Sequence, residues 1–125
     1  MQEFFLEATQ YTPEIHLNPN GTFSMKGKSY PENTFEFYKP VMEWIEEYVV
    51  NNKSNTITVN MEIIYFNSSS SKLFFDLFDL LDENRNNRKI TVNWLYDEEN
   101  ESAMEAGQDF AEDFEELHIE LIAKK

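Results

Sequence analysis

Two strand-like segments on either side of an amphipathic helix most constrain what this chain can fold into. Thr56–Phe66 (TITVNMEIIYF) is β-branched and becomes continuously apolar at its end, and Lys89–Tyr96 (KITVNWLY) is similar, as in interior strands of a sheet. Between them, roughly over Ser71–Asn84, an apolar stripe has helical spacing. The stripe is Leu73, Phe74, Leu77, Phe78 and Leu81, with Asp76, Asp79 and Asp82 facing outward. Strands alternating with helices predict an α/β fold with a partly parallel sheet.

The N-terminal half extends this pattern. Short strands are expected at Glu3–Thr9, Glu14–Leu17 and Thr22–Met25, and the turn Asn18-Pro19-Asn20-Gly21 joins the last two as an antiparallel hairpin. A helix is expected over Thr34–Val50, capped by Asn33 or Thr34. Its apolar stripe is Phe37, Val41, Trp44, Ile45 and Tyr48. Pro40 should kink this helix or mark its true first turn.

The C-terminal third is acidic over Asp97–Glu116. Met104, Gln108 and Ala111 could line one face of a third helix there, although Gly107 weakens that helix. Leu117–Ala123 is expected to be a last strand, and Asn51–Asn55 and Arg85–Arg88 to be polar loops. The chain is therefore predicted to be one α/β domain over residues 1–125, with a mixed central sheet packed against helices.

Charge and composition exclude several classes of function. The chain has 125 residues and a net charge of −14, a field that repels nucleic acid and anionic membranes. It has no Cys, and His16 and His118 lack metal-ligand spacing, so they are expected on strand faces. The N-terminal residues do not resemble a signal peptide, and no apolar stretch is long enough to span a bilayer. We therefore expect a cytoplasmic protein.

The segment Tyr65-Phe66-Asn67-Ser68-Ser69-Ser70-Ser71-Lys72 places four hydroxyls at a strand-to-helix corner. The first N–H groups of a helix are free to meet an anion. A serine here can cap the helix (Ser69 or Ser70), contact a phosphate or accept one. A phosphoryl group on Ser68 would add about −1.5 to −2 charges, which the helix dipole accepts locally and an acidic partner surface repels.

A second notable segment is the loop Ser29-Tyr30-Pro31-Glu32-Asn33. It reads equally well as a rigid turn, with Pro31 fixing φ and Asn33 capping the next helix, or as a docking surface beside the serine corner.

An enzyme is the main alternative. The acidic segment contains carboxylates that could do acid/base work or bind Mg²⁺: Asp97, Glu98, Glu99, Glu101, Glu105, Asp109, Glu112 and Asp113. A charge run on a helix is more often a solvated face. The chain has three Gly and no Gly-rich phosphate loop, and it lacks a G-x-S-x-G nucleophile turn. We expect no catalytic activity, no metal and no cofactor.

Several motifs, in order and spacing, resemble the SiaC family of bacterial regulatory phosphoproteins. They are Thr12-Pro13, Gly27-Lys28-Ser29-Tyr30-Pro31-Glu32-Asn33, Trp44, the Tyr65–Lys72 segment, Trp94-Leu95-Tyr96 and Glu105-Ala106-Gly107-Gln108-Asp109. The resemblance covers nearly the whole chain. The G-x-S-Y-P-E-N and Y-F-N-[ST]-S-S-[SA]-K stretches are its most specific parts.

The resemblance implies a STAS-like α/β fold and a function as a phosphoswitch. Family members are phosphorylated on one hydroxyl by a partner kinase, and a PP2C-like phosphatase reverses this. In the best-understood system the unphosphorylated form activates a diguanylate cyclase, which promotes cyclic-di-GMP synthesis. The acceptor, directly after Tyr-Phe-Asn, is often Thr and falls on Ser68 here, with Ser69 as the neighbouring alternative.

These observations lead to one expected function and two alternatives. We expect a non-catalytic signalling switch with Ser68 as the phosphoacceptor, at a corner shaped by Asn67, Ser69, Ser70 and Lys72. Lys72 either brings a cation near the phosphate or is a solvated surface residue. The alternatives are a Mg²⁺-dependent enzyme and a constitutive binding module whose serines only cap a helix.

Overall fold

One sheet organises the part of the chain that the structure describes. The computed structural model covers residues 1–51, 56–86 and 88–125, and within them six strands form a single sheet in their order along the chain. The strands are β1 (Phe4–Leu6), β2 (Glu14–Asn18), β3 (Thr22–Ser29), β4 (Thr56–Phe66), β5 (Lys89–Asp97) and β6 (His118–Lys124). The helices are α1 (Thr34–Asn51), α2 (Ser68–Glu83) and α3 (Glu101–Asp113). Over the described residues, none of these helices is long and apolar enough to cross a bilayer.

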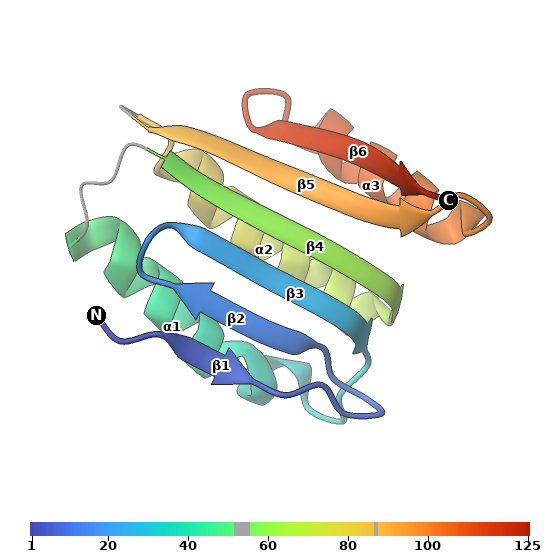
Figure 1. The fold of residues 1–125 in the computed structure, drawn as a ribbon, viewed down its shortest axis with the longest axis horizontal. Helices are drawn as coiled ribbons and strands as arrows, with labels where there is room; N and C mark the ends of the chain where they lie inside the picture. Colours follow the sequence, from blue (N-terminus) through green and yellow to red (C-terminus); the bar gives the residue numbers. More distant parts are fainter. Residues whose placement is uncertain (52–55, 87) are drawn as a thin grey trace.

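The connections place the helices together. Strands β1, β2 and β3 form an antiparallel meander, whereas β3, β4, β5 and β6 run parallel and are joined through α1, α2 and α3. Crossovers between parallel strands are right-handed. Because each parallel strand lies next to the one before it in the chain, always on the same side, all three crossover helices fall on the same face of the sheet. Figure 1 shows the three helices behind the sheet, with its other face uncovered. The predicted α/β fold with a mixed sheet is confirmed.

The core lies between the sheet and the helices. In β4 the buried residues alternate with more exposed ones, as expected for a strand covered on one face only. The predicted stripe of α2 is confirmed, because all five of its members are buried: Leu73, Phe74, Leu77, Phe78 and Leu81. Tyr38 of α1, which lies outside the predicted stripe, is completely buried. Trp44 was expected in the core, but it is half-buried, and its indole Nε1 donates a hydrogen bond to the Gln2 carbonyl at 3.0 Å.

Several predicted boundaries of strands and helices are wrong, and for β3 the reason is pairing with a neighbouring strand. Strand β3 continues to Ser29, instead of ending at Met25, because its last residues pair with the end of β4 beyond an irregularity at Gly27 and Lys28. Strand β1 is shorter than predicted. Pro40 lies inside α1 and does not mark its first turn. The predicted loops fall partly on residues 52–55 and 87, which lie outside the described residues.

Helix α3 confirms the expected helix but corrects its buried face. Its inward residues are Ala103, Gly107 and Phe110, while Gln108, which was expected on that face, is exposed. A Cβ on Gly107 would lie 2.5 Å from Cδ1 of Trp94 and 2.6 Å from Cδ2 of Leu121. The glycine that weakens the helix in isolation therefore lets α3 approach β5 and β6 closely.

Replacing Gly107 with alanine should destabilise the protein although alanine favours helices. The gain in helix propensity is about 1 kcal/mol, whereas crowding a methyl group against the buried Trp94 ring costs about 1–3 kcal/mol. Urea unfolding should show a lower free energy of unfolding for Gly107→Ala than for the parent. The variant Gln108→Ala, at the exposed neighbouring position, should be as stable as the parent. A more stable Gly107→Ala protein would contradict the close packing of α3.

Candidate functional site

The serine corner lies where β4 ends and α2 begins, at the carboxyl end of the parallel strands, the edge at which α/β sheets carry their sites. Asn67 is the N-cap of α2, with its side-chain Oδ1 accepting a hydrogen bond from the Ser70 N–H at 2.9 Å. The Asn67 N–H in turn donates to the Ser29 carbonyl at 3.1 Å, which fixes the corner to β3. Helix α2 therefore starts at Ser68, three residues earlier than predicted, and neither Ser69 nor Ser70 is the cap.

The four serines point in different directions because each helical residue is rotated about 100° from the last. Ser68 and Ser69 are exposed, Ser71 is half-buried and Ser70 is completely buried. The first two can meet a partner enzyme, whereas Ser70 cannot. The sequence treats the run as four equivalent hydroxyls, and the fold separates them.

Ser70 belongs to a buried chain of hydroxyl groups beneath the corner. Its Oγ donates to the Ser29 carbonyl at 2.9 Å and lies 2.8 Å from the Ser29 Oγ. The Ser29 Oγ lies 2.6 Å from the Tyr38 Oη. Each serine has one proton, so Tyr38 donates to Ser29 and Ser29 donates to Ser70. The chain ties the start of α2 to the end of β3 and to α1.

Tyr38→Phe should weaken the protein and alter its response to alkali. Loss of one buried hydroxyl from the chain costs about 1–2 kcal/mol. Burial raises the pKa of Tyr38 to about 12. Above its ordinary pKa of about 10, Tyr38 ionises first in the unfolded state, which lowers the stability of the parent by about 1.4 kcal/mol per pH unit until the folded pKa is reached.

The measurement is denaturant unfolding of the parent and Tyr38→Phe at several pH values. The stability advantage of the parent should be complete below pH about 10 and shrink between about 10 and 12. Tyr65→Phe, which removes a hydroxyl from an exposed side chain, should leave stability at neutral pH unchanged. An advantage that stays constant as the pH rises would show that Tyr38 ionises equally in both states.

The two exposed serines face different surroundings. Ser68 lines a depression of about 440 Å³ between α2 and α3, together with Ser71, Lys72, Phe75, Ala106, Asp109, Phe110 and Asp113. Ser69 lines a separate one of about 450 Å³ with the residues of the β3–α1 loop. Lys72 borders both depressions and, among the described residues, takes part in no ion pair. A phosphate on either serine would thus have this cation nearby.

The charges around Ser68 oppose one another. The amides of Ser68 and Ser69 precede the first hydrogen bonds of α2, so they can meet an anion, and the helix dipole favours negative charge there. Across the depression, Asp109 and Asp113 of α3 disfavour it. A phosphoryl group would therefore be drawn toward the helix terminus and Lys72 and away from α3.

The loop Ser29–Asn33 divides into structural and accessible parts. Ser29 was a candidate for partner binding, but it is completely buried at the end of β3, so a partner cannot touch it. Asn33 caps α1, since its Oδ1 accepts from the Glu36 N–H at 3.1 Å. Tyr30, Pro31 and Glu32 stay at the surface. The loop is thus both a cap and an accessible rim of the corner.

Two surface features near the corner were missed from the sequence. Tyr11, Tyr30 and Tyr65 form a row of edge-to-face rings with centroid distances of 5.2 and 5.4 Å. Phe35, at the start of α1, is 76 % exposed. In the sequence, the only sign of these two features is that aromatic residues cluster around the Ser29–Asn33 loop and the Tyr65–Lys72 segment.

The acidic C-terminal segment does not converge on one point. Its carboxylates are spread along the end of β5, the following turn and α3. Within the described residues there is no group of three or more His, Asp or Glu side chains that could hold a metal ion. His16 and His118 lie on strands β2 and β6, and each is placed beside a carboxylate.

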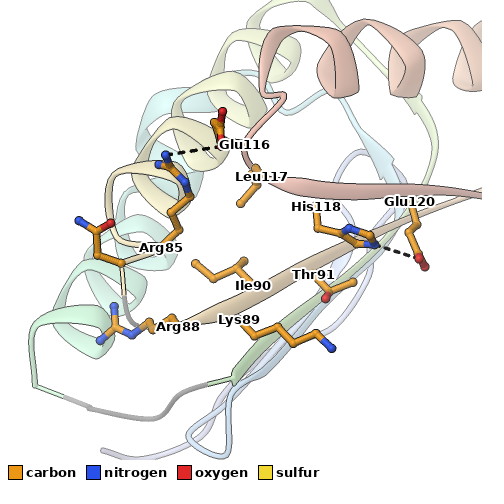
Figure 2. A pocket seen from close by; sticks show the side chains of 10 residues that line it. Arg85, Arg88, Lys89, Ile90, Thr91, Glu116, Leu117, His118 and Glu120 are labelled. Carbon is orange, nitrogen blue, oxygen red and sulfur yellow. Dashed lines mark hydrogen bonds and ion pairs between the residues drawn. The ribbon is translucent and has the colours of Figure 1, made fainter.

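A basic depression of about 590 Å³ lies at the opposite end of the sheet, where β5 and β6 begin (Figure 2). Arg88 Nη2 donates to the Val49 carbonyl at 2.7 Å, and Arg85 Nη1 donates to the Asp82 carbonyl at 3.0 Å. Arg85 also lies 4.0 Å from Glu116 across the depression. The two arginines hold the carbonyl ends of α1 and α2 and are far from the serines, so we assign this cluster a structural role.

Comparison with known proteins gives concordant matches. A model of the SiaC family of regulatory phosphoproteins matches residues 6–124. An uncharacterised protein of Pseudomonas aeruginosa strain UCBPP-PA14 is 34% identical over 115 residues, which are 90% of each chain.

Solved structures agree in fold. Apo-SiaC from Pseudomonas aeruginosa superposes with a TM-score of 0.91 at 31% identity, covering 98% of this chain and 100% of that one. A second match is a chain in the structure of the diguanylate cyclase SiaD in complex with its activator SiaC, also from Pseudomonas aeruginosa. It superposes with a TM-score of 0.90 at 32% identity, covering 97% of this chain and 99% of that one.

Proposed function

Since this chain belongs to the SiaC family of regulatory phosphoproteins, we propose that it is a signalling switch controlled by reversible phosphorylation of Ser68. It acts as one unit over its whole length and has no catalytic activity of its own. The phosphoryl group comes from a partner kinase and is removed by a PP2C-like phosphatase. The unphosphorylated form binds and regulates an effector, and cytoplasmic ATP makes the cytoplasm the natural site of this exchange.

The observation that carries the proposal is the position of Ser68. It is the first residue of α2, directly after the Asn67 cap, and it is exposed. A kinase can therefore reach its hydroxyl without unfolding the helix. Because Asn67 supplies the cap, Ser68 is free of that structural duty, and its modification does not remove the first hydrogen bond of the helix.

The surroundings of Ser68 support reversible control. The free amides at the helix terminus and Lys72 are able to hold the phosphate, while Asp109 and Asp113 limit how tightly it is held. The buried chain through Ser70, Ser29 and Tyr38 keeps the corner rigid, so the added charge acts on the surface and not on the core.

A diguanylate cyclase is the effector class that the comparisons favour. The structurally similar SiaC is the activator in a complex with the cyclase SiaD. We propose that this chain binds an effector of the same kind through the surface around its serine corner, and that phosphorylation prevents the contact.

Mass spectrometry of the protein isolated from its native host tests the phosphosite. We expect a phosphoryl group on Ser68 that disappears after treatment with a PP2C-type phosphatase. Ser69→Ala, a change at the other exposed serine, should keep the modification, whereas Ser68→Ala should lose it. Phosphate found on Ser69 alone would move the switch to the other depression, and phosphate on neither serine would remove the case for a switch.

A further inference from the structure

A groove of about 460 Å³ runs between helices α1 and α2 on the surface away from the sheet. Apolar side chains from both helices line it: Phe35, Met42, Leu73 and Leu80. Carboxylates flank them, with Glu43 and Glu46 on α1 and Asp76, Asp79 and Glu83 on α2. The groove is thus an apolar channel with an acidic wall on each side.

The groove reaches the serine corner. Phe35, Leu73 and Asp76 line both the groove and the depression that contains Ser69. Phe35, at this junction, is 76 % exposed, the highest value among the large apolar side chains of the described residues. An aromatic side chain exposed beside an apolar channel is typical of an interaction site.

The acidic walls are electrostatically incomplete. In the described part of the chain, none of the five carboxylates takes part in an ion pair, and Lys39 is the one cation in the lining. Two rows of like charge face each other across the channel and repel. Cations placed along the channel would relieve this repulsion.

We propose that this groove binds a basic amphipathic helix of the effector. Helices bind in grooves through an apolar stripe, and the acidic residues, spaced three and four apart along α1 and α2, would match Lys or Arg on both flanks of such a stripe. A second copy of this chain does not fit, because its exposed helix faces are acidic as well. This inference names the partner chemistry of the proposed switch and so rests on that function.

A synthetic peptide tests the groove directly. The probe is an amphipathic Leu/Lys peptide of about 18 residues, enough for about five helical turns. Titrated into the full chain, it should bind and shift NMR signals of residues along α1 and α2. A Leu/Glu peptide of the same pattern should not bind, and raising the salt concentration should weaken the Leu/Lys complex.

Two variants and two matched controls localise the binding. The variant Phe35→Ala and the double variant Glu43→Lys with Glu46→Lys should each lower the affinity for the Leu/Lys peptide at least about tenfold. Phe5→Ala removes another exposed phenylalanine, and Glu98→Lys with Glu99→Lys makes the same change in net charge on an exposed turn that does not line the groove. Both controls should bind the peptide like the parent.

The docking proposal would be overturned if the variants and their controls lost the same amount of peptide affinity. It would also be overturned if the peptide shifted NMR signals of residues outside α1 and α2. Its failure can be told from failure of the switch. Phosphate on Ser68 without groove binding keeps the switch and rejects this docking surface, whereas groove binding in a protein that is never phosphorylated keeps the surface and rejects the switch.

Discussion

Phosphorylation of Ser68 is expected to weaken effector binding at least about a hundredfold, which corresponds to about 2.8 kcal/mol. The corner is exposed in the free protein and would be covered in the complex. Closing a partner over a dianion removes it from water. Ser68 lies in the depression between α2 and α3 and not in the α1–α2 groove, so the basic residues proposed for the effector helix would not lie over the phosphate, and the penalty is several kcal/mol. Asp109 and Asp113 line the same depression, so covering it would remove their charges from water as well and add to this penalty.

Single substitutions separate the charge from the hydroxyl. Ser68→Ala should bind the effector constitutively and leave the helix intact, because Asn67 remains the cap. Ser68→Asp should bind weakly, although one carboxylate copies a phosphate imperfectly. The effector recovered from host lysate with Ser68→Ala is then titrated calorimetrically with the parent, the phosphorylated protein and Ser68→Asp.

Ser102→Ala is the matched control, since it removes an exposed hydroxyl from α3 that does not line the Ser68 depression. It should bind like the parent and lose binding on phosphorylation in the same way. Equal affinity of the phosphorylated and unphosphorylated parent would show that the phosphate does not control the effector.

Leu77→Asp should unfold the protein or destabilise it by more than about 4 kcal/mol. Leu77 is 1 % exposed and lies in the middle of the buried stripe of α2. The substitution removes apolar burial and leaves a carboxylate without a partner in the core. Against a typical total stability of about 5–15 kcal/mol, such a loss removes between about a quarter and most of the free energy of unfolding.

Circular dichroism and thermal melting measure this effect. Phe75→Asp is the control, because it introduces the same charge two residues away at a position that is 42 % exposed. Phe75 contacts the Phe114 ring, so the control should lose about 1 kcal/mol and remain folded. Leu77→Asp melting at the parent's temperature would contradict the assigned core of α2.

Much of the fold follows from local pattern. The interior character of Thr56–Phe66 and Lys89–Tyr96 predicted β4 and β5, and helical spacing predicted all five buried apolar residues of α2. Such periodicities survive in the structure because burying one face of an element against one sheet face requires the same spacing wherever that element lies.

The candidate site was only partly predictable. The motif located the corner and the exposed Ser68, but the sequence put the cap on Ser69 or Ser70 and not on Asn67. It also offered Ser29 as a partner contact, and the structure buries Ser29 under the corner. Asparagine and serine have similar cap preferences, so local chemistry could not choose between them.

By itself, the sequence determined the order of strands and helices, the apolar face of α2 and the place of the serine corner. Only the tertiary structure decided which hydroxyl is buried, because Ser70 owes its burial to Ser29 and Tyr38, distant in the chain. The tertiary structure also explains the glycine inside α3, because the Trp94 ring of β5 leaves no room for a Cβ at position 107. Periodicity is a property of one segment, whereas caps, burial and close approach depend on which segments meet.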